Sequence, residues 1–243
     1  MLAFMLIMPK FARKPDEKFK TKHAVFDDFT NKTIFKLISE GHFDGLESPL
    51  YVGKESNVFI ARKEDKQIIV KIYRLETCDF NKMYDYIKED PRYDNLRGKR
   101  RKIIFAWVQR EFRNLLKARE GGVRVPKPIT FQNNVLVMEF IGDNEPSQKL
   151  KNAIPKDPKE FLDDIVENMR RLYKAGLVHA DLSPFNILSY NEKPVFIDFS
   201  QCTPVRISRG IEFLERDIHN IASFFRKIGI KADENEIKSR IIS

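Results

Sequence analysis

Apolar residues recur every three or four positions along two long stretches of the chain, which predicts two amphipathic helices. In the first stretch, from Ile103 to Arg119, the apolar side chains form one stripe, and Gly121-Gly122 ends the pattern. In the second, Asp157 and Pro158 form a typical helix start, and Gly176 marks the end. Shorter helices are predicted over residues 27–38, from about 214 to 229, and from about 233 onward.

Short runs of strand-forming residues alternate with turns over residues 49–73 and 123–140. The pattern predicts strands near 50–52, 58–61 and 68–73, with a glycine-containing loop at 53–57. Two further strands are expected at 123–130 and 135–140, after which Ile141-Gly142-Asp143-Asn144 breaks the pattern. Because strands dominate before this break and helices after it, we predict an α+β fold with a hinge between two lobes.

Composition adds little beyond size and charge. A chain of 243 residues can form one large domain or two small lobes with a buried core. The formal net charge of +9 suits a polyanionic partner, but charge alone does not separate RNA, an anionic membrane and a nucleotide. Cys78 and Cys202 have no Cys or His at metal-binding spacing, so we expect reduced intracellular thiols.

The first residues, Met1–Met8, are apolar. Spanning a bilayer takes about 20 such residues, so this segment is too short. A mis-chosen start codon or an N-terminal strand explains them better than a targeting signal. We therefore expect a cytoplasmic protein with no membrane partner.

The strongest chemical signal is a loop that begins at His179 and carries Asp181 and Asn186 five positions apart. A short apolar strand then ends in Asp198. Phosphoryl transfer from a nucleotide needs an acid to orient the nucleophile, and an amide plus a carboxylate to hold a metal. The spacing H-x-D-x-x-x-x-N, followed by D-F, matches the catalytic and metal-binding loops of kinases. We expect His179 to brace the loop rather than act as a base, since Asp181 is the acid in the right place.

Two charged residues interrupt apolar patterns. Lys71 lies within a predicted strand, where its side chain either points to solvent or contacts phosphate. Glu111 lies in the middle of the apolar stripe of the first long helix, and a buried carboxylate is costly unless a cation meets it. We predict that Lys71 pairs with Glu111; the alternative is that Glu111 lies at the edge of the stripe.

Three other features remain open at this stage. The loop at 53–57 could lay its backbone N–H groups over phosphates or form an ordinary hairpin. Residues 74–102 are highly charged and read as a solvated, mobile insertion, with a dedicated RNA contact as the alternative. Asp217 lies beside the apolar face of a late helix, where it can accept hydrogen bonds from the Asp181 loop or remain exposed in the first turn.

These motifs together resemble the RIO family of atypical serine/threonine protein kinases, and within it the Rio1 branch. The resemblance runs from about residue 30 to 228 and is carried by five segments, GKESNVF (53–59), VKIYR (70–74), HADLSPFN (179–186), IDFSQ (197–201) and LERD (214–217). The charged insertion, and too little preceding sequence for a winged helix, favour Rio1 over Rio2. The short tails resemble those of archaeal members.

The resemblance implies a trimmed two-lobed protein-kinase-like fold without an activation loop. Its parts would be a basic and helical N-terminal extension (1–48), an N-terminal lobe (49–140) that includes the insertion, and a helical C-terminal lobe (141–243). It also implies ATP with Mg²⁺ or Mn²⁺, serine autophosphorylation, and a role in maturing the small ribosomal subunit. The precursor of that subunit, with its rRNA and ribosomal proteins, would be the partner.

The resemblance also assigns roles to residues. Asp181 would be the catalytic acid, Asn186 and Asp198 would hold the metal, and Lys71 with Glu111 would position phosphate. Asp198 could itself accept phosphate during ATP hydrolysis. Further nucleotide contacts would come from the loop and the hinge region, namely from Lys54, Ser56, Val58, Met138, Glu139 and Ile141. Met138 can equally serve as plain core packing.

Two departures from ordinary kinases fit an enzyme that loop phosphorylation does not control. Ala180 replaces the arginine that reads a phosphorylated activation loop, and Ser200 replaces the glycine after Asp-Phe. Only 45 residues follow Asp198, too few for the helical platform that grips peptide substrates in ordinary protein kinases.

Two rival functions remain besides an ATP-dependent serine/threonine kinase or ATPase. One is a nucleotide-gated module that binds rRNA with little turnover, which the net charge favours. The other is a small-molecule phosphotransferase, because aminoglycoside and choline kinases share the H-x-D-x-x-x-x-N arrangement.

Overall fold

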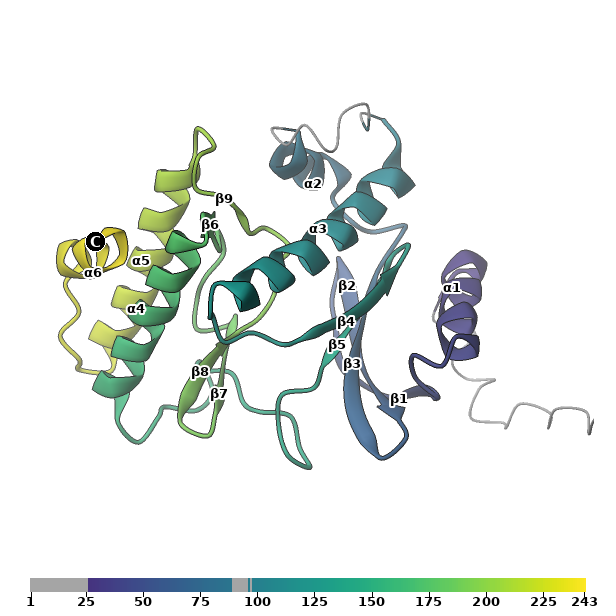
Figure 1. Ribbon diagram of the computed structural model, residues 1–243, viewed down its shortest axis with the longest axis horizontal. Coiled ribbons are helices and arrows are strands. Elements are labelled where there is room, and N and C mark those ends of the chain that lie inside the picture. The colour runs from purple at the N-terminus through teal and green to yellow at the C-terminus, as the bar shows by residue number, and fades with distance from the viewer. Residues whose placement is uncertain (1–25, 89–95, 97) are drawn as a thin grey trace, which may run out of the picture.

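The computed structural model describes residues 26–88, 96 and 98–243 and shows a sheet half and a helical half (Figure 1). The sheet half contains α1 (Asp28–Ser39), β1 (Gly45–Val52), β2 (Ser56–Lys63), β3 (Lys66–Tyr73), α2 (Phe80–Ile87), α3 (Arg100–Glu120), β4 (Pro128–Gln132) and β5 (Val135–Glu139). The helical half contains α4 (Pro158–Lys174), β6 (Leu177–Val178), β7 (Ile187–Tyr190), β8 (Lys193–Phe196), β9 (Thr203–Pro204), α5 (Gly210–Lys227) and α6 (Glu234–Ile242). The predicted two-lobed α+β fold is confirmed.

The sheet is antiparallel and has five strands in the order β1-β2-β3-β5-β4. Two strand boundaries differ from the prediction. β1 begins at Gly45, within the segment predicted as an N-terminal extension, and β4 begins at Pro128 rather than near 123. Val123 and Val125 are buried although they lie outside any strand, so burial rather than strand pairing explains their apolar character.

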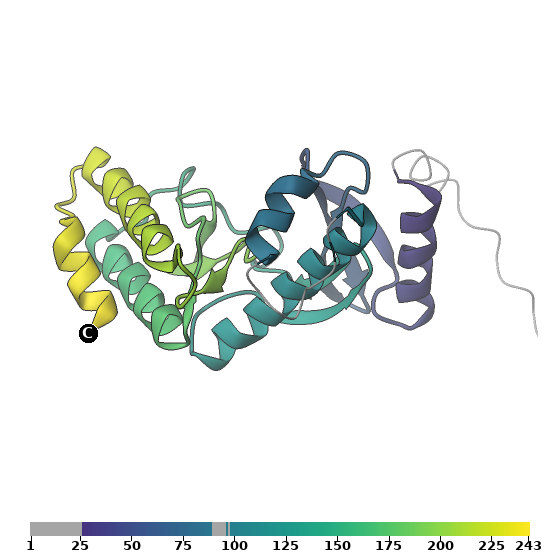
Figure 2. The same cartoon turned by 90° about the horizontal axis from the view of Figure 1, so that it is seen from above.

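Helix α1 covers the outer face of the sheet, at the end of the molecule far from the helical half (Figure 2). Asp27 caps it by accepting a hydrogen bond from the Thr30 N–H. Ile34 and Leu37 pack on a cluster of sheet residues that includes Phe59 and Val70. The predicted N-terminal helical segment is therefore an integral part of the sheet half.

Helix α3 covers the other face of the sheet and joins the two halves. One continuous apolar core runs from the inner sheet residues Ile60 and Ile69, through Trp107 and Leu115 of α3, to Phe225 of α5. Both termini of α3 agree with the predicted helix to within a few residues. This single core explains why a residue on α3 can face residues from both halves.

The predicted solvated insertion needs correcting. Helix α2 lies within it, begins at the capping residue Asp79, and buries Met83 and Ile87 against the same core. Residues 89–95 and 97 of the insertion lie outside the described residues, as does the apolar start of the chain. Helix α2 has only eight residues, and its two buried positions lie one turn apart. This pattern is too short to predict a helix from the sequence.

The helical half is built from α4 and α5, with α6 packed at the far end (Figure 2). After Asp198 the chain reaches α5 through residues 199–209, which form only the two-residue strand β9. The predicted absence of an activation loop agrees with this short connection. Within the described residues, no helix is both long enough and apolar enough to cross a membrane.

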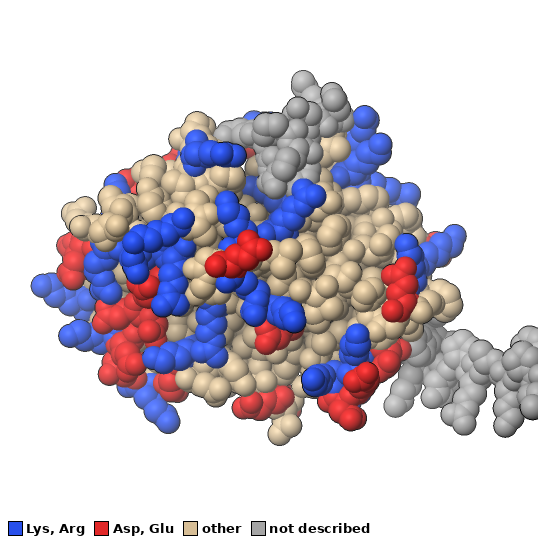
Figure 3. All heavy atoms as spheres, viewed as in Figure 1, with Lys and Arg blue, Asp and Glu red and all other residues tan. Residues whose placement is uncertain are grey.

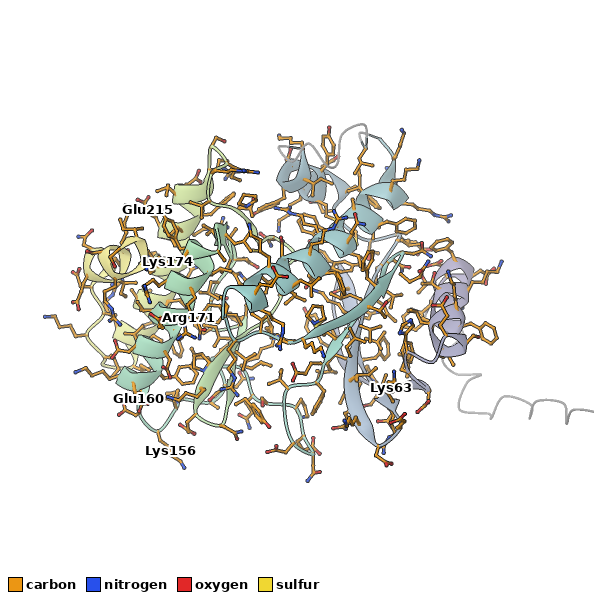
Figure 4. All side chains as sticks on the ribbon, in the orientation of Figure 1. Lys63, Lys156, Glu160, Arg171, Lys174 and Glu215 are labelled. Carbon is orange, nitrogen blue, oxygen red and sulfur yellow. The ribbon has the colours of Figure 1, made fainter. Side chains whose placement is uncertain are left out.

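Charged side chains of both signs alternate over the face that carries α3 and α4 (Figure 3). Arg171 and Lys174 of α4 lie on this face (Figure 4), and Arg171 pairs with Glu167 at 2.9 Å. These cations stand in the last turns of α4, where they offset the negative end of the helix dipole. Their position is therefore explained by helix stability alone.

Packing of α1 on the sheet is testable with two neighbouring residues. Leu37 is 1% exposed and Phe35 is 71% exposed on the same helix. We expect Leu37→Ala to lower the free energy of unfolding by about 2–5 kcal/mol, since it leaves a cavity against the sheet. Phe35→Ala should change it by about 0.5 kcal/mol or less. Urea denaturation measures both, and equal effects would contradict the docking of α1.

Candidate active site

The loop between β6 and β7 carries Asp181 and Asn186. The Asn186 side-chain amide donates to the Asp181 backbone oxygen at 2.9 Å and lies 3.3 Å from Asp181 Oδ2. Gln201 also donates to Asp181 Oδ2, at 3.3 Å. These bonds orient both residues on one side of the loop. The sequence predicted the first pair by spacing and missed Gln201, which follows the Asp-Phe motif by only two positions.

Asp217 holds this loop from α5. Its two carboxylate oxygens accept hydrogen bonds from the backbone N–H groups of Ala180 and Leu182, each at 2.8 Å. The Arg216 guanidinium donates to the Ala180 backbone oxygen. Ala180 has φ 65°, a left-handed conformation that a non-glycine residue adopts only where its surroundings fix it. Of the two alternatives for Asp217, the structure confirms the loop-bracing one.

Asp198 follows β8 and also has a left-handed backbone, with φ 63°. Its Oδ1 atom accepts hydrogen bonds from Lys71 Nζ at 2.9 Å and from Ser200 Oγ at 2.8 Å. The side chain remains 41% exposed, so its carboxylate stays open to a ligand. Burial would raise its pKa, but Lys71 and Ser200 lower the pKa of Asp198 to about 2.

Lys71 lies between two carboxylates. Besides Asp198, its Nζ atom contacts Glu111 Oε1 at 2.8 Å, and the Glu111 side chain is 1% exposed. Burial would lower the pKa of Lys71, but the charges of Asp198 and Glu111 raise it well above the ordinary value. The predicted Lys71–Glu111 pair is present, although the two residues are 40 positions apart.

Tyr73 completes the ion pair and was missed by the sequence analysis. Its hydroxyl donates to Glu111 Oε2 at 2.5 Å, so each Glu111 oxygen has one partner. Lys71 and Tyr73 are two positions apart on β3, and alternation along a strand places both on the same sheet face. That alternation is the signal in the sequence that could have indicated the hydroxyl.

The loop at 53–57 connects β1 to β2, and side chains from the segment after β3 donate hydrogen bonds to its backbone oxygens. Arg74 and Thr77 side chains donate to the backbone oxygens of Gly53 and Lys54, at 3.3 and 2.5 Å. Glu55 accepts from Cys78 Sγ at 3.1 Å. Lys54 is exposed and Ser56 half-buried, while Val58 pairs with Lys71 across β2 and β3. The loop is thus tied to the segment that follows β3, which no motif indicated.

The hinge residues differ in what they offer. Met138 is buried in the core, and the Glu139 carboxylate turns away to accept a hydrogen bond from the Lys127 N–H at 2.8 Å. The Ile141 carbonyl accepts from the Ser147 N–H at 2.9 Å. The Glu139 carboxylate and the Ile141 carbonyl are therefore both engaged by backbone N–H groups of the protein itself.

The donor set around Asp198 fits a hard cation such as Mg²⁺. The amide nitrogen of Asn186 donates to Asp181, so the Oδ1 atom of Asn186 points away from Asp181. Asp198 adds an exposed carboxylate. No group of three or more His, Cys, Asp or Glu side chains forms a metal cage among the described residues. Mg²⁺ is suited to such a site because it is usually bound by one or two carboxylates, with waters and substrate phosphates as its other ligands.

This fold and this set of residues define a protein of the protein-kinase class. The RIO domain family matches residues 57–237, and the chain belongs to that family. A RIO-type serine/threonine-protein kinase Rio1 of Haloferax volcanii is 42% identical over 226 residues, covering 92% of this chain and 78% of that protein. The Rio1 of Methanocaldococcus jannaschii is 43% identical over 217 residues, covering 88% and 74%.

Solved structures agree on the fold. A crystal structure of the Rio2 kinase from Chaetomium thermophilum, as an ADP/Mg²⁺-phosphoaspartate complex, matches with a TM-score of 0.70 at 23% identity. The match covers 89% of this chain and 67% of that one. The predicted family and the predicted enzyme class, a serine/threonine-protein kinase, are confirmed at the level of the family.

His179 provides a pH test of the site. It is buried, and its Nε2 atom lies 3.0 Å from the Ile197 backbone oxygen, as expected for a loop-bracing residue. Burial lowers the pKa of His179 to about 4, below the usual value of about 6.5.

Between these two pH values the unfolded chain binds a proton that the folded chain does not. The contribution of His179 to the free energy of unfolding is therefore complete above pH 6.5. It is lost as the pH falls toward 4, by up to about 3 kcal/mol. We expect the stability difference between wild type and His179→Gln to narrow over this range in urea denaturation. A difference independent of pH would contradict the buried neutral imidazole.

Proposed function

We propose that this protein is an ATP- and Mg²⁺-dependent serine/threonine protein kinase of the RIO type, with Mn²⁺ as the alternative metal. The observation that carries the proposal is the position of Lys71, which contacts Glu111 and Asp198 at the same time. Phosphoryl transfer in kinases requires a lysine held by a helix glutamate, next to the carboxylate that holds the metal. The loop that carries Asp181 and Asn186 supplies the remaining groups.

Asp181 is the residue that accepts the proton of the acceptor hydroxyl, at Oδ2. Its carboxyl is only partly buried, and Asn186 and Gln201 hold it in one orientation. Burial and the charge of Asp198 raise the pKa of Asp181, which makes it a better proton acceptor. An acceptor hydroxyl within hydrogen-bond reach of Oδ2 would be oriented for attack.

Asn186 and Asp198 are the metal-holding residues. When bound, the metal neutralises the charge that develops on the phosphate oxygens. Lys71 would exchange part of its contact with Asp198 for phosphate, while Glu111 and Tyr73 keep its side chain in place. The remaining nucleotide contacts fall to the loop and hinge residues: Lys54, Ser56, Val58, Met138, Glu139 and Ile141.

Asp198 can also accept phosphate itself. Its carboxylate is exposed, its pKa is low, and the related Chaetomium structure contains a phosphoaspartate. ATP hydrolysis through an acyl-phosphate is therefore part of the proposal, together with serine autophosphorylation. An Asp198 oxygen would bond to the γ-phosphorus as its bond to ADP breaks, and water would then hydrolyse the acyl-phosphate to phosphate and the free carboxylate. We further infer a role in small ribosomal subunit maturation in the cytoplasm, which the net charge of +9 supports.

The proposal is tested with purified protein, labelled ATP and Mg²⁺. Asp198→Asn should reduce both ATP hydrolysis and autophosphorylation by about a hundredfold to a thousandfold, since a charge that acts on the transition state is lost. Asp65→Asn, in the exposed turn between β2 and β3, is the matched control and should retain wild-type rates. Unchanged activity of Asp198→Asn would overturn the assignment.

A second candidate is a nucleotide-gated factor that binds rRNA with little turnover. The observation in its favour is the start of α3, where the exposed residues Lys99, Arg100, Arg101 and Lys102 follow one another without an acidic side chain in the first turn. Helix starts normally favour acidic residues, so the helix dipole does not explain this run. Arg100 and Arg101 also pack over the rings of Phe80 and Phe29, which leaves Lys99 and Lys102 as the cations best placed for RNA.

RNA binding has a distinct signature. We expect the logarithm of RNA affinity to fall with the logarithm of salt concentration, with a slope of roughly 0.7–0.9 per phosphate contact. Lys102→Ala should reduce that slope by about one contact, as measured by fluorescence anisotropy with a small-subunit rRNA fragment. Affinity that does not respond to salt would count against this candidate.

A further inference from the structure

Helix α2 lies at the upper edge of the sheet half (Figure 1), and its last turn lies close to the start of α5. Tyr86 of α2 stacks on Phe213 of α5, with ring centroids 5.7 Å apart, and meets Trp107 of α3 edge-on at 5.9 Å. A cavity of about 150 Å³ remains at the junction, lined by residues of α2 and of the chain entering α5. The helix of the insertion therefore reaches the part of the helical half next to the catalytic loop.

Lys82 and Arg216 each lie one helical turn from one of the two stacked rings. Lys82 stands one turn before Tyr86, so both lie on the same face of α2. Arg216 stands one turn after Phe213, packs over its ring at 5.0 Å, and donates to the Ala180 backbone oxygen, adjacent to Asp181. The stacked pair Tyr86–Phe213 thus places Lys82 of α2 near α5, where Arg216 contacts the backbone next to Asp181.

The electrostatics of Asp181 agree with this placement. Burial and Asp198 raise the pKa of its carboxyl, and the charges that oppose them are those of Arg216 and Lys82. Lys82 is exposed and has no ion pair within the described part of the chain. Carboxylates on the two helices are engaged elsewhere: Asp79 caps α2, Asp85 pairs with Lys88, and Glu212 pairs with Arg209.

We propose that Lys82 and Arg216 form a docking surface for an acidic acceptor segment, one that carries Glu, Asp or a phosphorylated residue beside the acceptor serine. The proposal rests on the proposed kinase function. It accounts for how a peptide is held although residues 199–209 are too short to form a platform. An acidic segment suits this surface because Lys82 and Arg216 are both exposed cations, which attract carboxylates and phosphates.

The test uses two fluorescent peptides that differ only at the positions flanking one serine, Glu in the first and Gln in the second. Binding to the full chain with Mg·ADP is measured by anisotropy at low salt. The wild type should bind the Glu peptide about threefold to fivefold more tightly, the range expected for one exposed ion pair. Lys82→Ala should remove most of that preference, and Lys82→Glu should make a Lys-flanked peptide the better ligand.

Lys66→Ala is the matched control, since this exposed lysine is the first residue of β3, outside α2 and α5. It should keep the wild-type preference, and thermal melting checks that every variant is folded. Equal binding of the two peptides by the wild type, no detectable binding, or an unchanged preference in Lys82→Ala would each overturn the docking surface. Tighter binding of a single-stranded RNA that weakens in Lys82→Ala would assign the surface to nucleic acid instead.

Failure of the proposed function gives a different result. A wild-type chain that does not bind Mg·ADP at all would contradict the kinase, whatever the peptides do. A chain that binds Mg·ADP and hydrolyses ATP, but ignores the charge of the peptide, would contradict only the docking surface.

Discussion

Lys71 is the one group on which both halves of the molecule depend. It lies on β3, Glu111 lies on α3, and Asp198 follows β8, so a single ammonium group joins three distant parts of the chain. Removing a charge from water costs several kcal/mol, which is recovered only when every donor and acceptor finds a partner. Tyr73 provides the last of these partners on Glu111. The buried ammonium group of Lys71 therefore requires β3, α3 and the segment after β8 to stay in contact.

The second constraint is the shared core. Because α3 contributes to the core on both sides, Glu111 cannot shift without moving side chains that also pack in the helical half. Packed interiors respond to such shifts in discrete steps rather than gradually. The Lys71–Glu111 contact is thereby linked to the loop that Asp217 holds, although no direct bond joins them.

The sequence predicted those features that leave a local pattern. Glu111 stood out because it interrupts an apolar stripe, and Asp181, Asn186 and Asp198 because their spacing is specific. Features that depend on distant segments were missed. The Tyr73 hydroxyl, the Gln201 amide and the bonds from Arg74 and Thr77 each join groups between 20 and 38 positions apart. Apart from the alternation that places Tyr73 on the same face of β3 as Lys71, such contacts follow from how elements pack, which leaves no periodic pattern in the sequence.

The attachment of the 53–57 loop has a kinetic consequence. Its backbone oxygens are bound by Arg74, Thr77 and Cys78, in the stretch that leads directly into α2. Under the proposed function, the loop would lift from a nucleotide only if these hydrogen bonds broke or α2 moved with it. In the proposed kinase, exchange of ADP for ATP would therefore be coupled to α2, and a molecule bound to α2 would slow product release from a site that it does not touch.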